Sequence, residues 1–215
     1  MKHYESELPI GYREDYLIDA KNTLSGSYVV KSDTRLIAKA SFNQCSLLTS
    51  ITIPENVEAI GSLAFYDCES LSEVFWNAKN CKITSGTNLY GKAVTFGDAP
   101  IRTFKFGDNV QTIPAYLCYE MNTLQSITLP NSVTTIGGYA FVGCYFLTSV
   151  TIPENVTNIG RNAFSSCSSL TSITWNAKNY ANISSPTSSS NPFYEIRSQI
   201  TSFKFGDSVA CVPNY

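Results

Sequence analysis

Short runs of alternating apolar and polar residues are the first regular feature of this chain. In the run that ends at Trp175, the apolar residues are Leu170, Ile173 and Trp175, and Ser and Thr lie between them. The last four positions alternate with a period of two and are rich in β-branched residues, which is typical of a short β-strand. In the preceding run, which ends at Ile152, a Pro, Glu and Asn turn follows. A Gly and an Ala-Phe pair come next, for which we expect a short helical turn.

The same apolar pattern returns every 23 residues. Residues of one type recur at this spacing in six series: Phe42–Phe65, Cys45–Cys68, Phe141–Phe164, Cys144–Cys167, Val110–Val133–Val156 and Ile113–Ile136–Ile159. A fixed period of this size indicates a repeat protein. A single unit cannot cover its own apolar face, so each unit has to stack on its neighbours.

A second, longer period of 99 residues lies over the first. "WNAKN" occurs at residues 76–80 and 175–179, and "FKFGD" at residues 104–108 and 203–207. From Trp76 to Phe106 the spacing is 30 residues rather than 23. The long coils contain residues 81–100 and 180–199, which replace the usual Gly and Ala-Phe phrase with a longer excursion. A duplicated block of four coils explains this order.

Stacking these units predicts a right-handed solenoid of the α/β class with one parallel β-strand per coil, all in one sheet. We expect about eight coils of 23 or 30 residues, with strands at these positions: Val30, Ile53, Trp76, Phe106, Leu129, Ile152, Trp175 and Phe205. The solenoid occupies residues 24–215. Residues 1–23 fall outside the pattern and are expected to be a cap or the tail of an upstream segment. Residues 208–215 match the start of a coil and then stop, so we expect a solenoid truncated at its C-terminus.

Composition and motifs exclude several classes of function. The net charge is −2 with only 15 Lys and Arg, which argues against a nucleic-acid-binding face. No apolar run approaches the roughly 18 residues of a membrane span. His3 is the only histidine, and no Cys-x-x-Cys pair or phosphate-binding loop is present, so we expect no metal site, no cofactor and no catalytic residues. We therefore predict that the chain is not an enzyme.

The cysteines follow the repeat. Four of the seven cysteines share one position of the coil: Cys45, Cys68, Cys144 and Cys167. We expect them to form a ladder of small, buried, reduced side chains. Disulfides are the alternative, and the odd total requires at least one unpaired thiol or an intermolecular link.

The outward face of the strands is the first candidate for a binding surface. Its central positions are Thr52, Phe75, Lys105, Thr128, Thr151, Thr174 and Lys204. Thr is common on any half-exposed strand and needs no ligand to explain it. The exceptions are the better candidates, so we predict that Phe75, Lys105 and Lys204 bind ligand.

The long coils are the second candidate, because insertions in solenoids often fall on one face and carry binding. Their aromatic residues Tyr90, Phe193 and Tyr194 are predicted ligand-binding residues. The alternative is a longer loop that folds its aromatic side chains inward. The pattern alone favours neither.

Phrases such as "LTSVTIPENVTNIGRNAFSSC", residues 147–167, resemble the BspA-like leucine-rich repeat proteins. The resemblance covers residues 24–215. The long coils depart from it, as does Cys118, which replaces the usual Phe. It implies a bacterial or protist surface protein, often adhesive, whose partners are host or extracellular-matrix proteins.

The function we expect is a non-enzymatic, adhesin-like binding module with a protein ligand. Its location at the cell surface or in secreted form follows only from the resemblance, because the first residues lack an apolar signal core. Two alternatives remain open, a structural spacer of a larger surface protein and an intracellular interaction scaffold.

Overall fold

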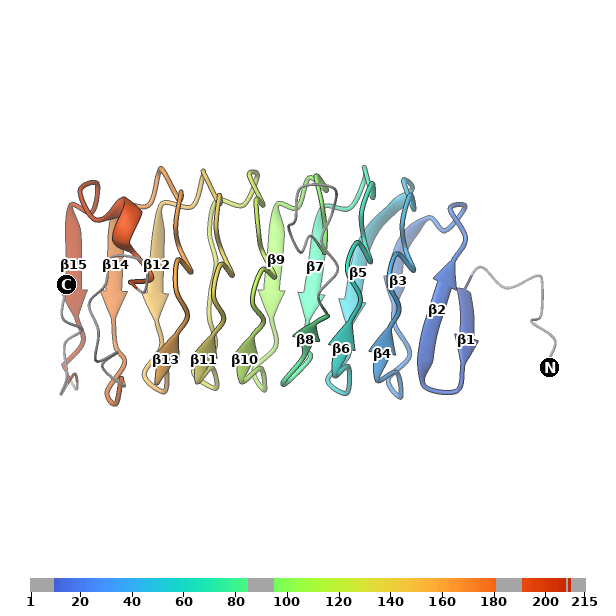
Figure 1. The fold of residues 1–215 in the computed structure, drawn as a ribbon, viewed down its shortest axis with the longest axis horizontal. Coiled ribbons are helices and arrows are strands. Elements are labelled where there is room, and N and C mark those ends of the chain that lie inside the picture. The colour runs from blue at the N-terminus through green and yellow to red at the C-terminus, as the bar shows by residue number, and fades with distance from the viewer. Residues whose placement is uncertain (1–9, 85–94, 181–190, 208, 210–215) are drawn as a thin grey trace.

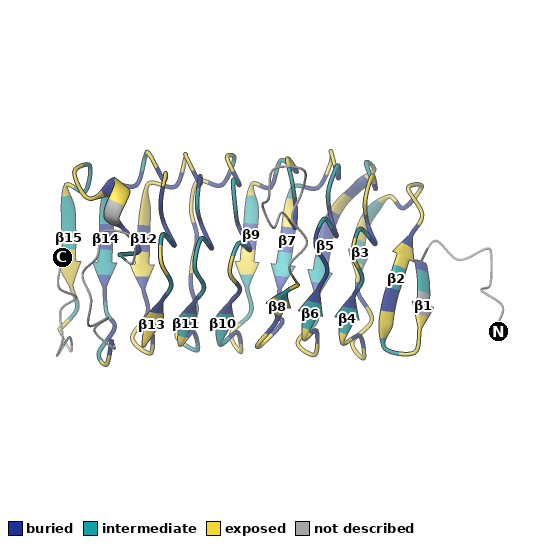
Figure 2. Ribbon diagram, viewed as in Figure 1, coloured by how far each residue is buried: buried dark blue, intermediate teal, exposed yellow. Residues whose placement is uncertain are grey.

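The computed structural model describes residues 10–84, 95–180, 191–207 and 209, and it shows one elongated stack of coils (Figure 1). Strands of successive coils lie side by side along the stack, which confirms the predicted parallel-strand solenoid. The buried residues lie on the inner sides of the coils, and the turns at both edges are exposed (Figure 2). The core therefore runs the length of the stack.

The predicted strands form one face of the stack, which we call the ribbon. β3 (Gly26–Val29), β5 (Leu48–Ile53), β7 (Glu73–Trp76) and β9 (Thr103–Phe106) make a four-stranded parallel sheet. β12 (Ser149–Ile152), β14 (Ser172–Trp175) and β15 (Ser202–Phe205) make a three-stranded parallel sheet. The expectation of one continuous sheet is wrong, because the strand expected at Leu129, the fifth of the eight, does not form.

A second short strand in most coils was not predicted. β4 (Leu36–Ile37), β6 (Ala59–Ile60) and β8 (Lys82–Ile83) form one such row, and β10 (Thr112–Ile113), β11 (Thr135–Ile136) and β13 (Asn158–Ile159) form another. An Ile of each strand lies in register with an Ile of the next. A strand of two residues is too short to show alternation, so the sequence pattern carries no sign of it.

An antiparallel hairpin lies at the N-terminal end of the stack. It consists of β1 (Ile10–Arg13) and β2 (Tyr16–Ala20), with an irregularity between Gly11 and Tyr12. β2 pairs in parallel with β4, so the hairpin extends the second row of strands (Figure 1). Among the described residues, antiparallel pairing occurs only in this hairpin.

The expected helical turn after each second strand does not form. Alternate backbone N–H groups here donate to the next coil, as in the bond from Phe42 N to Ala64 O at 2.8 Å. Backbone angles with positive φ interrupt any helix at Ala40, Gln44, Leu63, Asp67, Tyr116, Glu120, Tyr139, Asn162 and Ser166. The one helix in the described part of the chain is the 3₁₀ helix η1 (Tyr194–Ile196).

Two stacks of phenylalanine rings form the centre of the core. In the first stack the Phe42, Phe65 and Phe96 centroids are 4.9 Å apart at each step. In the second, the steps from Phe141 to Phe164 and on to Phe193 are 5.1 and 5.0 Å. These distances are close to the spacing of about 4.8 Å between paired strands. Between the two stacks, the buried Cys118 holds the corresponding place.

The cysteine ladder is confirmed. Cys45, Cys68, Cys144 and Cys167 are buried and free. The Cys68 thiol donates to Phe42 O at 3.1 Å, and the Cys167 thiol donates to Phe141 O at 3.0 Å. Each thiol thus bonds to a carbonyl of the preceding coil. Cys211 lies outside the described residues.

Packing explains why "WNAKN" and "FKFGD" recur together. A Cβ atom at Gly107 would lie 2.3 Å from Asn77 Oδ1, and one at Gly206 would lie 2.4 Å from Asn176 Oδ1. Each Asn side chain of a long coil therefore occupies the space that a Cβ atom would need in the next coil, so any residue other than Gly would require the Asn side chain to move. The two phrases form one structural unit.

Candidate functional site

The ribbon places the predicted outward residues in rows. In the first sheet, strand register aligns Val29, Thr52, Phe75 and Lys105. In the second sheet it aligns Thr151, Thr174 and Lys204. All of these side chains are half-buried or exposed, as outward positions require.

Phe75 and Lys105, two of the predicted ligand-binding residues, touch each other. Lys105 Nζ lies 5.4 Å from the centroid of the Phe75 ring. A cation over an aromatic face is worth roughly 0.5–1 kcal/mol at an exposed site. The half-buried Phe75 therefore has a structural contact of its own, and the two side chains present one mixed apolar and cationic surface. Lys204 is exposed beside Thr174.

Val29 extends this surface and was missed by the sequence analysis. Its side chain is 66% exposed, the highest value among the large apolar side chains that the structure describes as exposed. It heads the row that contains Phe75. The alignment of coils did point to position 29, because Val29 precedes Thr52 by the same 23 residues that separate the predicted strand positions Val30 and Ile53.

The ribbon is interrupted at residues 125–129. This segment takes part in no backbone hydrogen bond with any other described residue. Its neighbours hold it instead, since the Thr123 hydroxyl donates to Ile101 O and the Ser132 hydroxyl to Val110 O, both at 2.6 Å. Ile127 still faces the core, but it is 9% exposed, whereas Ile173 at the same position is 1% exposed.

A groove of about 360 Å³ lies at this interruption. Its walls are Arg102, Thr103, Phe104, Lys105, Phe106 and Asp108 on one side and Ser126, Thr128 and Pro130 on the other. The groove thus contains two cations, one carboxylate and several hydroxyl groups. Within the described part of the chain, neither Arg102 nor Lys105 forms an ion pair.

The long coils do not place all three predicted aromatic residues on the surface. Phe193 is 3% exposed, and its ring stacks on Phe164 at 5.0 Å. Its selection as a ligand-binding residue is therefore wrong, because the ring completes the core stack. Phe96 has the same role in the other long coil. Each ring follows the previous Phe of its stack by nearly one long-coil length, a signal that the sequence did contain.

Tyr90 and the side chain of Tyr194 lie outside the described part of the structure. The backbone of Tyr194 belongs to η1. Their role in ligand binding remains a prediction. For Phe96 and Phe193, the alternative in which long-coil aromatic residues fold inward is the correct one.

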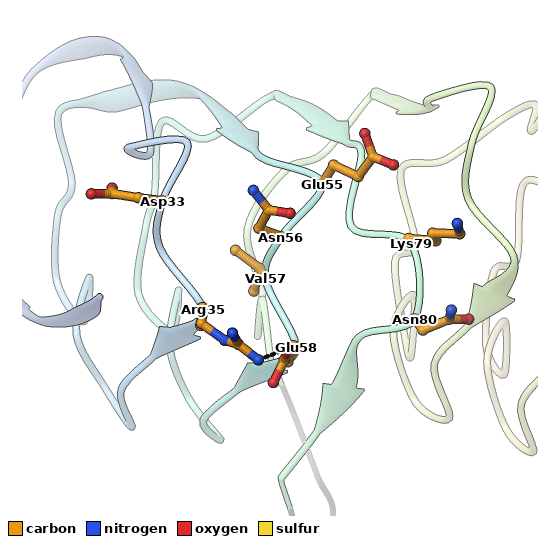
Figure 3. Close-up of a pocket in the computed structure, with 8 residues that line it drawn as sticks. All are labelled: Asp33, Arg35, Glu55, Asn56, Val57, Glu58, Lys79 and Asn80. Carbon is orange, nitrogen blue, oxygen red and sulfur yellow. Dashed lines mark hydrogen bonds and ion pairs between the residues drawn. The ribbon is translucent and has the colours of Figure 1, made fainter. Parts of the chain in front are cut away.

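A polar pocket of about 450 Å³ opens at the turns that follow β3, β5 and β7 (Figure 3). It is lined by Asp33, Arg35, Glu55, Asn56, Val57, Glu58, Lys79 and Asn80. Arg35 pairs with Glu58 and lies 3.9 Å from Asp15. These groups are largely exposed, and exposed ion pairs contribute little to stability. The cations and carboxylates of this pocket partly balance one another.

The buried thiols are poor nucleophiles. Burial raises the pKa of the Cys81 thiol to about 12, and burial together with the Cys45 thiol raises that of Cys68 to about 12. A hydrogen bond with Cys167, with burial, raises the pKa of Cys144 well above its usual range. Because the thiolate is the reactive species, these side chains serve packing rather than chemistry.

The described residues lack two further features, a metal-binding cluster and a membrane-spanning helix. They contain no group of three or more His, Cys, Asp or Glu side chains placed to hold a metal ion. No helix in the described ranges has the length and apolar character needed to cross a membrane.

Two solved structures share this fold. A leucine rich cell surface protein from Faecalibacterium prausnitzii is 24% identical, with a TM-score of 0.51, and the match covers 86% of this chain and 57% of that one. A leucine-rich repeat protein from Bacteroides ovatus is 21% identical, with a TM-score of 0.60, over 88% and 47% of the two chains. The present chain thus spans about half the length of these structures.

The repeat itself identifies the family. The sequence matches the BspA type Leucine rich repeat region in six copies, at residues 21–90 and 92–215. No curated protein matched the sequence. The matched ranges include every ribbon strand and both phenylalanine stacks. The chain therefore belongs to the BspA-type leucine-rich repeat family.

Proposed function

We propose that the chain is a protein-binding module of a cell-surface or secreted protein and that its ribbon contacts the ligand. The observation that carries this proposal is the row of Val29, Thr52, Phe75 and Lys105, held in register on a paired sheet. A row of this kind presents an apolar and cationic anchor on a rigid support. Host or extracellular-matrix proteins are the proposed partners, in keeping with an adhesin-like role.

The ribbon has enough area, but few of its residues can supply affinity. Standard interfaces bury about 800 Å² per partner, and Ser and Thr are rarely hot spots. The binding energy would come from Phe75, Lys105 and Lys204, with Tyr90 and Tyr194 from the long coils. Because the "FKFGD" strands recur after 99 residues, a partner with repeated epitopes could bind twice.

The surface location is supported by the relative from Faecalibacterium prausnitzii, which is described as a cell surface protein. We further propose that residues 1–23 form a cap for the solenoid of residues 24–215, because the β1–β2 hairpin pairs with the first coil. A structural spacer is the second candidate, favoured by the largely Ser and Thr ribbon of the second sheet. The same binding assay separates the two roles.

The test is binding of the intact chain to a panel of immobilised extracellular-matrix proteins. We expect Phe75→Ala to weaken binding by more than about ten-fold, as removal of a central anchor does. Its Tm should fall by only a few degrees, since about 0.5–1 kcal/mol of cation–π energy is lost.

Thr174→Ala is the matched control, because Thr174 occupies the same outward position in β14. It should change neither binding nor Tm. Unchanged binding by Phe75→Ala, or binding of no matrix protein by the wild type, would favour the spacer. Unfolding of Phe75→Ala would show that this side chain belongs to the core.

A further inference from the structure

The interruption of the ribbon leaves strand edges without backbone partners inside a continuous stack. The amide of Thr103 in β9 donates to Ser72 O at 3.1 Å, and the amide of Gly107, directly after β9, donates to Trp76 O at 2.9 Å, both in the preceding coil. Successive residues of a strand direct their N–H and C=O groups to opposite edges. The backbone groups of Phe104 and Phe106 therefore face residues 125–129, and none of them bonds to that segment.

The next coil shows the same loss on its other side. In the intact part of the ribbon, the Thr171 and Ser172 amides donate to Thr148 O at 3.1 and 3.3 Å. Within the described chain, no backbone hydrogen bond joins β12 to residues 125–129. The segment thus lies between two strands, and neither strand forms a backbone hydrogen bond with it. Unpaired edges are sites where a further strand can add.

The groove at this place reaches the backbone of β9. Phe104 and Phe106 line it, although Phe104 points into the core and is 4% exposed. Access from the ribbon face therefore extends to the level of the main chain. The hydroxyl groups of Ser126 and Thr128 line the opposite wall and can donate or accept hydrogen bonds.

The charges of the groove favour an acidic ligand. Arg102 and Lys105 are exposed, and among the described residues neither has a carboxylate partner. Asp108 lines the same groove, so two cations stand against one carboxylate. The fold does not require Arg102, because Thr201 holds its place in the second block, 99 residues later.

We infer that this groove, which we call the break groove, binds an extended peptide segment with acidic side chains. The peptide backbone would form hydrogen bonds with the N–H and C=O groups of β9 that face residues 125–129. Its carboxylates would bind Arg102 and Lys105. Strand addition of this kind takes its affinity from the main chain and its specificity from alternate side chains. Charge-assisted bonds to Arg strengthen it. The inference rests on the proposed function and names one segment that the protein ligand would present.

The test is a titration of the isotopically labelled intact chain with capped peptides, followed by NMR. The probe is a peptide of four Glu-Thr repeats, and the control peptide has four Gln-Thr repeats. We expect the Glu peptide to shift the amide signals of Phe104, Phe106, Ser126 and Thr128. It should bind about ten-fold more tightly than the Gln peptide, and added salt should weaken it.

Two variants complete the experiment. Arg102→Gln should weaken the Glu peptide by about ten-fold, a difference of roughly 1.4 kcal/mol, without a change in Tm. Lys39→Gln is the control, because Lys39 is an exposed cation that lies outside the groove. It should bind the peptide as the wild type does.

Several results would overturn the inference. These are the absence of shifts at millimolar peptide, shifts confined to other residues, equal binding of the Glu and Gln peptides, or an equal loss in Lys39→Gln. None of them would affect the proposed matrix binding, because that assay depends on Phe75. Conversely, a groove that binds the acidic peptide in a chain that binds no matrix protein would support this inference and overturn the larger proposal.

Discussion

Two neighbouring coils, residues 107–129 and 130–152, have the same length and nearly the same apolar positions, yet only the second forms a ribbon strand. The second coil contributes the Phe141 ring to a stack. The first has Cys118 at that place and Met121 where the second has Cys144. Both coils bury these side chains. Burial of the inward side chains is therefore not sufficient to pair the ribbon strand of a coil.

The ring stacks offer a physical reason for this difference. Stacked rings lie 4.9–5.1 Å apart, which matches the spacing of about 4.8 Å between paired strands. Where Cys118 replaces the ring, the core contains no such spacer. The loss of pairing falls only on the ribbon side of this coil, because the Cys118 amide still donates to Ala140 O at 2.8 Å. The interruption of the stack and that of the ribbon fall in the same coil.

The largest expected effect tests whether the stack carries the stability. Phe141→Ala should destabilise the protein by about 3–5 kcal/mol, as loss of a buried ring does. Cys118→Ala should cost about 1 kcal/mol, because it removes one small buried atom from a place with no ring. Urea unfolding followed by circular dichroism measures both. Equal losses in the two variants would contradict the comparison.

A second, smaller effect tests how tightly the interrupted coil is packed against the next one. A Cβ atom at Gly137 would lie 2.3 Å from the backbone N of Ala115, whereas one at Gly138 would lie 3.3 Å from its nearest atom, Arg161 O. Gly137→Ala should cost about 1–3 kcal/mol because backbone has to move. Gly138→Ala is the matched control and should cost less. If both variants have the same midpoint of urea unfolding as the wild type, the two coils are not in close contact at Gly137.

The smallest effect concerns the buried thiols of the cysteine ladder, to which the second coil contributes Cys144. Because burial raises the pKa of Cys68 to about 12, its thiolate is scarce near pH 8 in the folded protein. We expect Cys68 and Cys144 to resist alkylation until the chain is denatured, and to react fully without reductant afterwards. Mass spectrometry of the modified peptides measures this. Recovery of markedly fewer thiols would indicate disulfides.

The raised pKa of Cys68 also makes the stability of the folded protein depend on pH. The folded protein holds the Cys68 proton more tightly than the unfolded chain, whose thiol has a pKa near 9.0. The contribution is therefore constant below about pH 9 and falls as pH rises toward 12. Cys68→Ala should show a shallower loss of stability than the wild type over this range. A steeper loss would contradict the burial of this thiol.

The period of the sequence predicts most of the architecture, because each coil repeats the same inward positions. It places Phe75 and Lys105 on the outer face and the four ladder cysteines inside. It also identifies the long coils, although it left open whether Phe193 points inward. Each of these predictions follows from the inward and outward positions within a single coil.

The features that the sequence missed depend on contacts between coils. The second strands are too short to alternate, and the expected helical turns yield to hydrogen bonds from one coil to the next, as at Phe42 and Ala64. The interruption at residues 125–129 keeps the apolar pattern intact, with Ile127 and Leu129 still facing the core. Only the replacement of a ring by Cys118 marks that coil in the sequence.

Amide hydrogen exchange of the intact, unliganded chain tests the central claim most directly, namely that the ribbon backbone is unpaired at residues 125–129. Ser126 and Thr128 should exchange fast, with little protection. Ser172 and Thr174, at the corresponding positions of β14, should exchange far more slowly, because β14 pairs with β12 and β15. Equal protection of Thr128 and Thr174 would show a continuous ribbon and contradict the account.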